Sequence, residues 1–216
     1  MKEVVLFDFD GTLTSRDTSR YLIIALLRTR MWLLPKILQP LWRLVLGGPE
    51  EAIQSAKDRS IGRLLCGISS AQLETALSLY SRAVRPLLRP LLMDKIRAKS
   101  SVGQHVLIVT ASAEIAVTKA LSANAVTVLG TRFEMVDGRF TGALDGVGCY
   151  GPHKVERIRA WGDLQTEKWT FVEAWSDSLS DLPMMMLADR RNWICAPKHI
   201  QKYKQQDPLA QIMHFD

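Results

Sequence analysis

The sequence predicts an α/β protein with a Rossmann-like, doubly wound parallel sheet and an all-helical cap inserted after the first strand. Short apolar runs of strand length alternate with segments of helical character over much of the chain. Such alternation is typical of parallel sheets with helices on both faces. Residues 15–88, in contrast, contain no convincing strand. We therefore expect a core domain made of residues 1–14 and 89–216 and a helical cap made of residues 15–88.

Five short, mostly apolar runs are the candidates for core strands, because buried parallel strands have this length and composition. They lie at residues 3–7, 105–110, 126–129, 170–175 and 193–196. The helices between them are expected at residues 112–122, 152–161 and 181–190. Asp137-Gly138, between two short runs in residues 132–142, predicts a hairpin turn outside the main sheet.

The composition is that of an ordinary globular protein. Of the 216 residues, 47% are hydrophobic and 23% are charged, whereas a disordered chain would be poorer in apolar residues. The formal net charge of +6 suits a phosphorylated small molecule, an anionic lipid or a nucleic acid. Because the sequence has no long Lys/Arg run and no zinc-finger spacing, we expect no nucleic-acid partner.

Neither the cysteines nor the first residues point to export. Cys66, Cys149 and Cys195 are far apart and odd in number, which favours reduced thiols. The chain reaches Asp8 before any apolar stretch of signal-peptide length. We therefore expect a cytoplasmic protein.

The strongest chemical signal is the sequence DFDGTLT at residues 8–14. It places the carboxylates of Asp8 and Asp10 at the end of a buried strand, where like charge and desolvation disfavour ionisation. A divalent cation removes this conflict, and oxygen ligands of this kind suit Mg²⁺. Gly11 lets the chain turn sharply, so that the amides of the following residues can point at an anion.

This segment resembles the first motif of the haloacid dehalogenase superfamily, DxDGT. The resemblance implies that Asp8 is a nucleophile that becomes transiently phosphorylated, and that Asp10 is the general acid and base. It also implies that Asp8 and the backbone carbonyl of Asp10 are metal ligands. Gly11 and Thr12 would then contact the substrate.

Thr110 and Lys154 resemble the second and third motifs of the superfamily. Thr110 ends an apolar run, and its hydroxyl would hydrogen-bond a phosphoryl oxygen, with Ala111 and Ser112 beside it. Lys154 follows Pro152 at an expected helix start, and its ammonium group would neutralise the phosphoryl group and Asp8.

The sequence SDSLSD at residues 176–181 resembles the fourth motif, SDxxxD. By this resemblance Asp177 is a metal ligand, and Asp181 orients the site and pairs with Lys154. Each of these motifs is weak alone, since strands often end in Thr and helices often start with Asp. Their occurrence in the family's order across nearly the whole chain supports the assignment.

Together the motifs imply a Mg²⁺-dependent phosphomonoester hydrolase that needs no further cofactor. The transition state of phosphoryl transfer spreads negative charge over three oxygens, which the cation, Lys154 and the hydroxyl and amide donors would bind. Two alternatives remain open: a non-catalytic relative that binds a lipid or a partner, and a transferase that passes the phosphoryl group to an alcohol.

The position of the cap resembles the phosphoserine phosphatase-like branch of the superfamily. In that branch a Glu nine residues after the nucleophile and an Arg of the cap bind the substrate. Here Asp17 occupies the first position, and Arg59 is the candidate for the second. A helix N-cap for Asp17 and a solvated charge for Arg59 are open alternatives.

Residues 31–46 form an apolar segment with basic residues. Bacterial phosphatidylglycerophosphate phosphatases of the superfamily have a similar segment, and a Cys-x-Gly-x-x-Lys stretch that resembles Cys149 to Lys154. This resemblance implies a lipid phosphate or another amphiphilic phosphate as substrate. The segment is too short to span a bilayer alone, but it could contact a membrane surface or form cap core or a dimer surface. The oligomeric state stays open.

Overall fold

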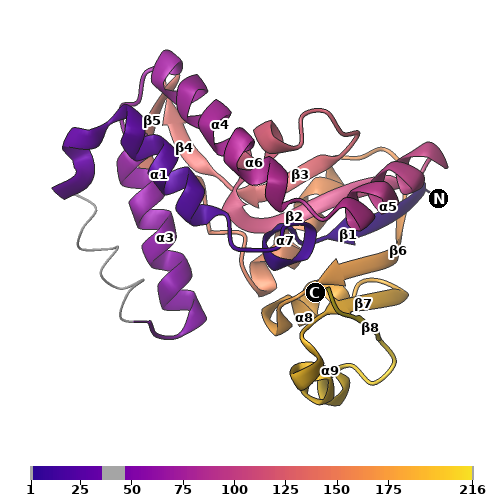
Figure 1. Cartoon of the computed structure of the whole chain (residues 1–216). Coiled ribbons are helices and arrows are strands. Elements are labelled where there is room, and N and C mark those ends of the chain that lie inside the picture. The colour runs from indigo at the N-terminus through magenta and orange to yellow at the C-terminus, as the bar shows by residue number, and fades with distance from the viewer. Residues whose placement is uncertain (1, 36–46, 216) are drawn as a thin grey trace.

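A computed structural model of the chain describes residues 2–35 and 47–215 (Figure 1). Its main sheet has six strands in the order β3-β2-β1-β6-β7-β8, and all of the paired strands are parallel. The predicted α/β class with a parallel sheet is confirmed. The strands are β1 (Lys2–Phe7), β2 (His105–Ala113), β3 (Thr127–Thr131), β6 (Trp169–Ser176), β7 (Arg190–Ile194) and β8 (Gln211–Met213).

Strand β1 lies at the centre of the sheet, between β2 and β6. The chain continues from β1 to β2 and β3 on one side and returns later to β6, β7 and β8 on the other. In open parallel sheets, ligands bind beyond the carboxyl ends of the strands at the point where the strand order reverses. The topology therefore directs attention to the residues that follow β1, β2 and β6.

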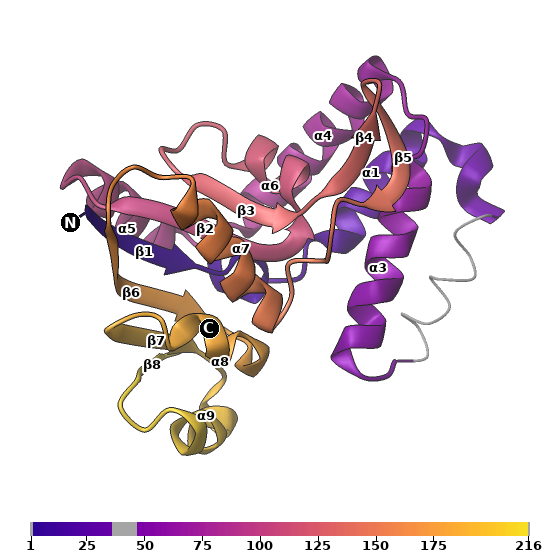
Figure 2. The same ribbon diagram turned by 180° about the vertical axis from the view of Figure 1, so that it is seen from behind.

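The two faces of the sheet carry separate apolar cores, because successive residues of a strand point to opposite faces. Val5 and Phe7 of β1 lie in one core, and Val4 and Leu6 lie in the other. Figures 1 and 2 show helices on both faces of the sheet. The first core includes residues of α5 (Pro90–Ser101) and α6 (Glu114–Ala120), and the second includes residues of α7 (Pro152–Asp163), α8 (Leu182–Met185) and α9 (Ile200–Gln206).

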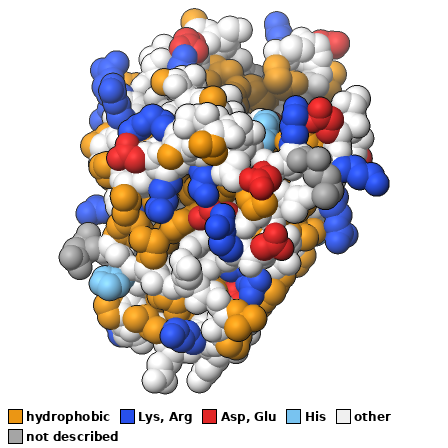
Figure 3. Space-filling model, turned by 90° about the vertical axis from the view of Figure 1, so that its right-hand side faces the viewer, with side chains coloured by type: hydrophobic (Ala, Val, Ile, Leu, Met, Phe, Trp, Pro, Cys, Tyr) orange, Lys and Arg blue, Asp and Glu red, His pale blue; other side chains and the backbone are white. Residues whose placement is uncertain are grey.

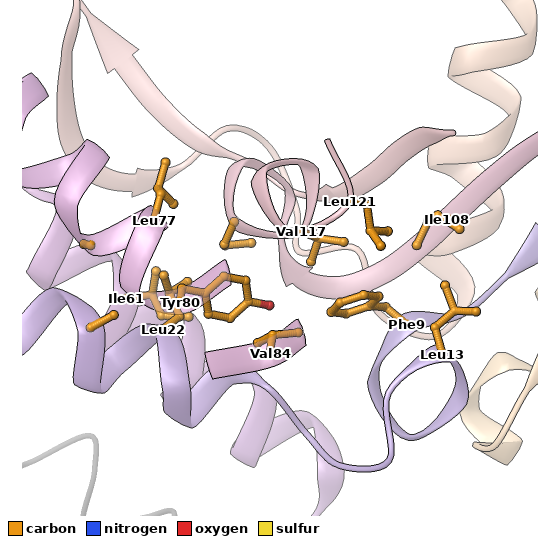
Figure 4. Packing of buried hydrophobic residues seen from close by; sticks show 14 of the residues in the cluster. Phe9, Leu13, Leu22, Ile61, Leu77, Tyr80, Val84, Ile108, Val117 and Leu121 are labelled. Carbon is orange, nitrogen blue, oxygen red and sulfur yellow. The ribbon is translucent and has the colours of Figure 1, made fainter. Parts of the chain in front are cut away.

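Between β1 and α5, the described residues include three long helices: α1 (Ser19–Thr29), α3 (Glu50–Leu65) and α4 (Ser70–Val84). Their apolar residues belong to the same cluster as one face of the sheet. Figure 4 shows Leu22, Ile61 and Tyr80 of these helices grouped together, with Val117 of α6 and Phe9 further along. The helical part therefore shares one apolar interior with the sheet. The division into a core of residues 1–14 and 89–216 and a cap of residues 15–88 stays a prediction.

The predicted hairpin is β4 (Phe133–Val136) paired with β5 (Arg139–Leu144) outside the main sheet. Asp137 and Gly138 both have positive φ, at 49° and 73°, as a tight hairpin turn requires. The hairpin packs on α3 so closely that a Cβ on Gly62 would lie 2.2 Å from the carbonyl oxygen of Gly142. Figure 2 shows β4 and β5 extending from the sheet beside α3 and α4. The hairpin therefore packs against the helical part of the chain on one side.

Several elements differ from the expectations. The helix expected at residues 181–190 is a short turn, Leu179–Asp181, followed by α8 of four residues, and β7 begins at Arg190. Strand β8 was not expected, because its three residues are too few to show a pattern.

On the face shown in Figure 3, Lys and Arg side chains are scattered among acidic and hydrophobic ones.

The membrane prediction for segment 31–46 falls largely on residues 36–46, which lie outside the described residues. In the described part of this segment, Met31–Leu33 form one helical turn, and the side chains of Met31 and Trp32 are exposed. Among residues 2–35 and 47–215, no helix is long and apolar enough to cross a bilayer.

Candidate active site

A cavity of about 260 Å³ lies at the carboxyl ends of β1, β2 and β6, and we call it the Asp8 cavity. Its charged lining consists of five aspartates and two lysines: Asp8, Asp10, Asp17, Asp177, Asp181, Lys57 and Lys154. If all seven were ionised, the acids would exceed the bases by three charges (five minus two). Such an excess of buried negative charge is costly unless a cation offsets it.

Lys154 links two of these aspartates. Its Nζ lies 2.7 Å from Oδ1 of Asp8, which follows β1, and 2.8 Å from Oδ2 of Asp181. Ser176, the last residue of β6, also donates a hydrogen bond of 2.7 Å to Oδ2 of Asp181. All four residues are buried. The first turn of α7 thus holds a cation against Asp8, and Asp181 holds that cation in place.

The pKa values of Asp8 and Asp177 show that nearby positive charge does not fully offset the cost of burying these carboxylates. Burial raises the pKa of Asp8 well above its usual range, and the charge of Lys154 offsets this only in part. Burial also raises the pKa of Asp177 to about 6, despite a hydrogen bond of 3.1 Å that its Oδ1 accepts from Thr12. For Lys154, burial acts to lower the pKa, but the carboxylates of Asp181 and Asp8 outweigh it and raise the pKa.

The oxygen atoms at this place fit Mg²⁺. Gly11 has a φ of 80°, and a Cβ there would lie 2.0 Å from Oδ2 of Asp177, so the turn after β1 passes directly against that carboxylate. Asp8 and Asp177 can each offer a carboxylate, and Asp10 can offer its backbone carbonyl. In the described part of the chain, no three His, Cys, Asp or Glu side chains are arranged as a metal site. Mg²⁺ does not need one, since it binds through one or two carboxylates and keeps several waters.

The side chain of Asp10 is held from two sides. Its Oδ1 accepts a hydrogen bond of 2.6 Å from the backbone N–H of Thr18, and its Oδ2 accepts one of 2.5 Å from Oγ of Ser112. Burial raises the pKa of Asp10, the charge of Asp17 adds to this effect, and the two hydrogen bonds oppose it. A fixed carboxyl group with a raised pKa is suited to proton transfer.

Thr110 and Ala111 line the cavity from the end of β2. The hydroxyl oxygen of Thr110 accepts a hydrogen bond of 3.0 Å from the backbone N–H of Ser112, which fixes its position. The carbonyl oxygen of Ala111 accepts one of 3.1 Å from Nε2 of Gln54 in α3. A helix of the inserted segment therefore touches the strand end directly.

Of the two substrate residues expected in the cap, the structure brings only Asp17 to the cavity. Asp17 forms an ion pair with Lys57, and its Oδ1 also accepts a hydrogen bond of 2.8 Å from the N–H of Ser19 at the start of α1. Arg59 lies outside the Asp8 cavity, where it donates to Ser55 of its own helix. Two residues along a helix turn the side chain by about 200°, so Lys57 and Arg59 point to different sides of α3.

Five residues of the cavity were missed by sequence reasoning: Gln54, Lys57, Tyr150, Ser178 and Ser180. The hydroxyl of Tyr150 donates a hydrogen bond of 2.6 Å to Oε2 of Glu50 at the start of α3. Tyr150, Ser178 and Ser180 lie within stretches that resemble the family, but the resemblance gives them no role, and Gln54 and Lys57 belong to no motif. The spacing of Gln54 and Lys57, three residues apart, places them on one helix face, but nothing in the sequence shows which face meets the sheet.

A family model for haloacid dehalogenase-like hydrolases matches residues 5–186, which include every motif described above. The chain belongs to this family. The sequence is 32% identical over 202 residues to Protein CicA of Caulobacter vibrioides, a match that covers 88% of this chain and 85% of that protein.

Solved structures share the fold of this chain. A protein of unknown function from Bordetella pertussis Tohama I superposes with a TM-score of 0.79 at 23% identity, over 99% of this chain and 98% of that one. A substrate-bound phosphoserine phosphatase superposes with a TM-score of 0.62 at 18% identity, over 98% of this chain and 93% of that one. The likeness therefore covers the inserted helices as well as the sheet.

Proposed function

We propose that this hydrolase is a Mg²⁺-dependent phosphomonoester phosphatase that works through an aspartyl phosphate on Asp8. The observation that carries this proposal is the buried contact of Lys154 with both Asp8 and Asp181 at the end of β1, with Asp10 fixed nearby. The similarity in fold to phosphoserine phosphatase supports a phosphomonoester as the class of substrate.

In the first step, a carboxylate oxygen of Asp8 attacks phosphorus and the bond from phosphorus to the ester oxygen breaks. Asp10 donates its proton to the leaving oxygen, so that a neutral alcohol departs. In the second step, Asp10 takes a proton from a water molecule, and this water attacks the phosphorus of the aspartyl phosphate. The bond to Asp8 breaks, and inorganic phosphate is released.

Lys154 and the donors around it bind the charge that moves during these steps. The ammonium group of Lys154 neutralises Asp8, which lets one anion approach another. The hydroxyl of Thr110 and the amides that follow Asp10 are the proposed donors to the phosphoryl oxygens. Mg²⁺, held by Asp8, Asp177 and the backbone carbonyl of Asp10, would supply further positive charge to the phosphoryl group.

Replacing Asp8 by Asn tests this mechanism, because an amide is a poor nucleophile. We expect Asp8→Asn to lower kcat for p-nitrophenyl phosphate at least about 10³-fold in the presence of Mg²⁺. Asp163→Asn, an exposed residue at the end of α7, is the matched control and should keep the wild-type rate.

Two results would contradict the proposal. One is a rate for folded Asp8→Asn that stays close to that of the wild type. The other is a folded wild-type protein, checked by circular dichroism, that releases no phosphate from any monoester with Mg²⁺, which would favour a non-catalytic binding protein.

A further inference from the structure

The Asp8 cavity is too small to hold a whole substrate of ordinary size. Its volume of about 260 Å³ must contain the phosphoryl group and the cation. Ligand pockets usually measure about 300 to 1,000 Å³. The alcohol part of the substrate must therefore lie in an adjoining space.

Two larger pockets of about 650 Å³ each adjoin the Asp8 cavity. The α1–α3 pocket lies between α1 and α3 and shares Asp17 and Lys57 with the Asp8 cavity. The α3–β5 pocket lies between α3 and the end of the hairpin and shares Gln54 and Tyr150 with it. The contacts of the shared residues distinguish the two.

Hydrogen bonds fix both residues that the α3–β5 pocket shares with the Asp8 cavity. Gln54 bonds to the carbonyl oxygen of Ala111, and Tyr150 bonds to Glu50, so both shared residues are tied across the boundary. The α3–β5 pocket is lined by Glu51, Asp58 and Arg59, so it offers a phosphate ester less positive charge than the α1–α3 pocket, which is lined by Arg16, Arg20 and Lys57. Among the described residues, the α1–α3 pocket shares with the Asp8 cavity the partly exposed ion pair of Asp17 and Lys57, and such ion pairs break at little cost.

The position of Asp10 directs the leaving alcohol toward α1. Asp10 is held by the N–H of Thr18, the residue directly before α1. It is also held by Ser112, whose Oγ lies 3.4 Å from Oγ of Ser19. Ser19 lines the α1–α3 pocket. The alcohol oxygen must lie beside Asp10 to receive its proton, so the rest of the alcohol extends along α1.

The α1–α3 pocket is amphiphilic. Its apolar lining comes from Ile23, Ile24 and Leu27 of α1 and from Ile53 of α3. Arg16, Arg20 and Lys57 add positive charge at the same pocket. Cations attract a phosphate group, and aliphatic walls favour a hydrocarbon chain.

We propose that the α1–α3 pocket binds the hydrocarbon chain of the leaving alcohol, so that the substrate is an amphiphilic phosphomonoester with a single chain held in the pocket. This inference rests on the proposed phosphatase activity. It names the pocket and the side chains that would bind the alcohol, which the motifs leave open.

A series of dissolved alkyl phosphates tests the pocket. Phosphate release from butyl, hexyl and octyl phosphate is measured below their micelle concentrations, with p-nitrophenyl phosphate as a substrate that needs no chain. Burying one methylene group favours binding by up to about fourfold, so kcat/KM should rise at least about tenfold from butyl to octyl phosphate. Equal values along the series would overturn the proposal.

Ile24→Ser probes the wall of the pocket, and Leu91→Ser is its matched control. Both side chains are 49% exposed on helix surfaces, but Leu91 lies on α5, outside the pocket. We expect Ile24→Ser to raise KM for octyl phosphate at least about fivefold and to leave p-nitrophenyl phosphate unchanged. Leu91→Ser should change neither. Equal effects of Ile24→Ser on both substrates would contradict a chain in this pocket.

Two further experiments distinguish a wrong assignment of the pocket from a wrong assignment of the phosphatase activity. If no monoester is hydrolysed, the phosphatase proposal fails, and calorimetric binding of octyl against butyl phosphate to the wild-type protein still tests the pocket. Tighter binding of octyl phosphate would support the pocket, and equal binding would overturn it. Hydrolysis of long-chain phosphates only in phospholipid vesicles, without chain-length dependence in solution, would indicate a membrane surface in place of the pocket.

Discussion

At the scale of single residues, the site holds more carboxyl groups than ammonium groups. Burial raises the pKa of both Asp8 and Asp177, and the single ammonium group of Lys154 already serves Asp8 and Asp181. Among the described residues, no ammonium group donates a hydrogen bond to Asp177, whose Oδ1 accepts one from the hydroxyl of Thr12. The affinity of the protein for Mg²⁺ should therefore depend on Asp177 more than on any exposed acid.

Asp177→Ala should weaken the binding of Mg²⁺ at least about tenfold, because one of its two proposed carboxylate ligands is lost. A ligand that binds only the folded state raises the melting temperature, so a titration of Tm with Mg²⁺ measures this effect without reference to turnover. Asp189→Ala, an exposed acid before β7, should leave the titration as in the wild type. A titration of Asp177→Ala that matches the wild type would refute the assignment.

At the scale of elements, the hairpin and α3 pack backbone to backbone through two glycines. A methyl group on Gly62 would collide with the backbone carbonyl of Gly142, which cannot move as a side chain would. We expect Gly62→Ala to lower the free energy of unfolding by about 1 to 3 kcal/mol, measured in urea.

Gly162→Ala is the control for this substitution. Gly162 also lies in a helix, α7, but an added Cβ there meets nothing within 4 Å. Because Ala has a higher helix propensity than Gly, this variant should gain up to about 1 kcal/mol of stability. If both variants changed stability equally, the close packing of α3 on β5 would not be the cause.

The elements also show what the sequence could and could not predict. Asp8, Thr110, Lys154 and Asp177 were placed in one cavity because each follows a strand or opens a helix, and parallel strands end at one edge. Lys57 was missed and Arg59 chosen, because the rotation of α3 depends on its packing against β5 and α1. The hairpin turn was evident from Asp137-Gly138, but its contact with α3 joins segments about 80 residues apart (142 minus 62), which no local pattern records.

At the scale of the whole molecule, one buried acid should make stability depend on pH. Asp58 of α3 is 8% exposed, and burial raises its pKa to about 7 despite a hydrogen bond from Gln54. The unfolded chain loses this proton near pH 4, whereas the folded chain keeps it to about pH 7. The folded state therefore binds more protons in this window, and its stability falls as the pH rises through it.

Asp58→Asn should remove this loss, since Asn carries no charge and can still accept the hydrogen bond from Gln54. We expect the variant to be more stable than the wild type at pH 8 by at most about 4 kcal/mol and to approach it in stability near pH 4. Urea unfolding at a series of pH values measures both curves. Parallel curves for the two proteins would show that Asp58 is ionised at little cost in the folded chain.

The apolar interior that joins α1, α3 and α4 to the sheet has a consequence for how a substrate enters. Tyr80 and Val84 of α4 are fully enclosed in the same cluster as Phe9 and Val117, so a wide swing of the helices away from the sheet would wet these surfaces. Breaking the ion pair between Asp17 and Lys57, in contrast, exposes none of these apolar side chains to water. We therefore expect the entrance to open by rotation of a few polar side chains, at a rate set by rotamer exchange rather than by movement of a whole lobe.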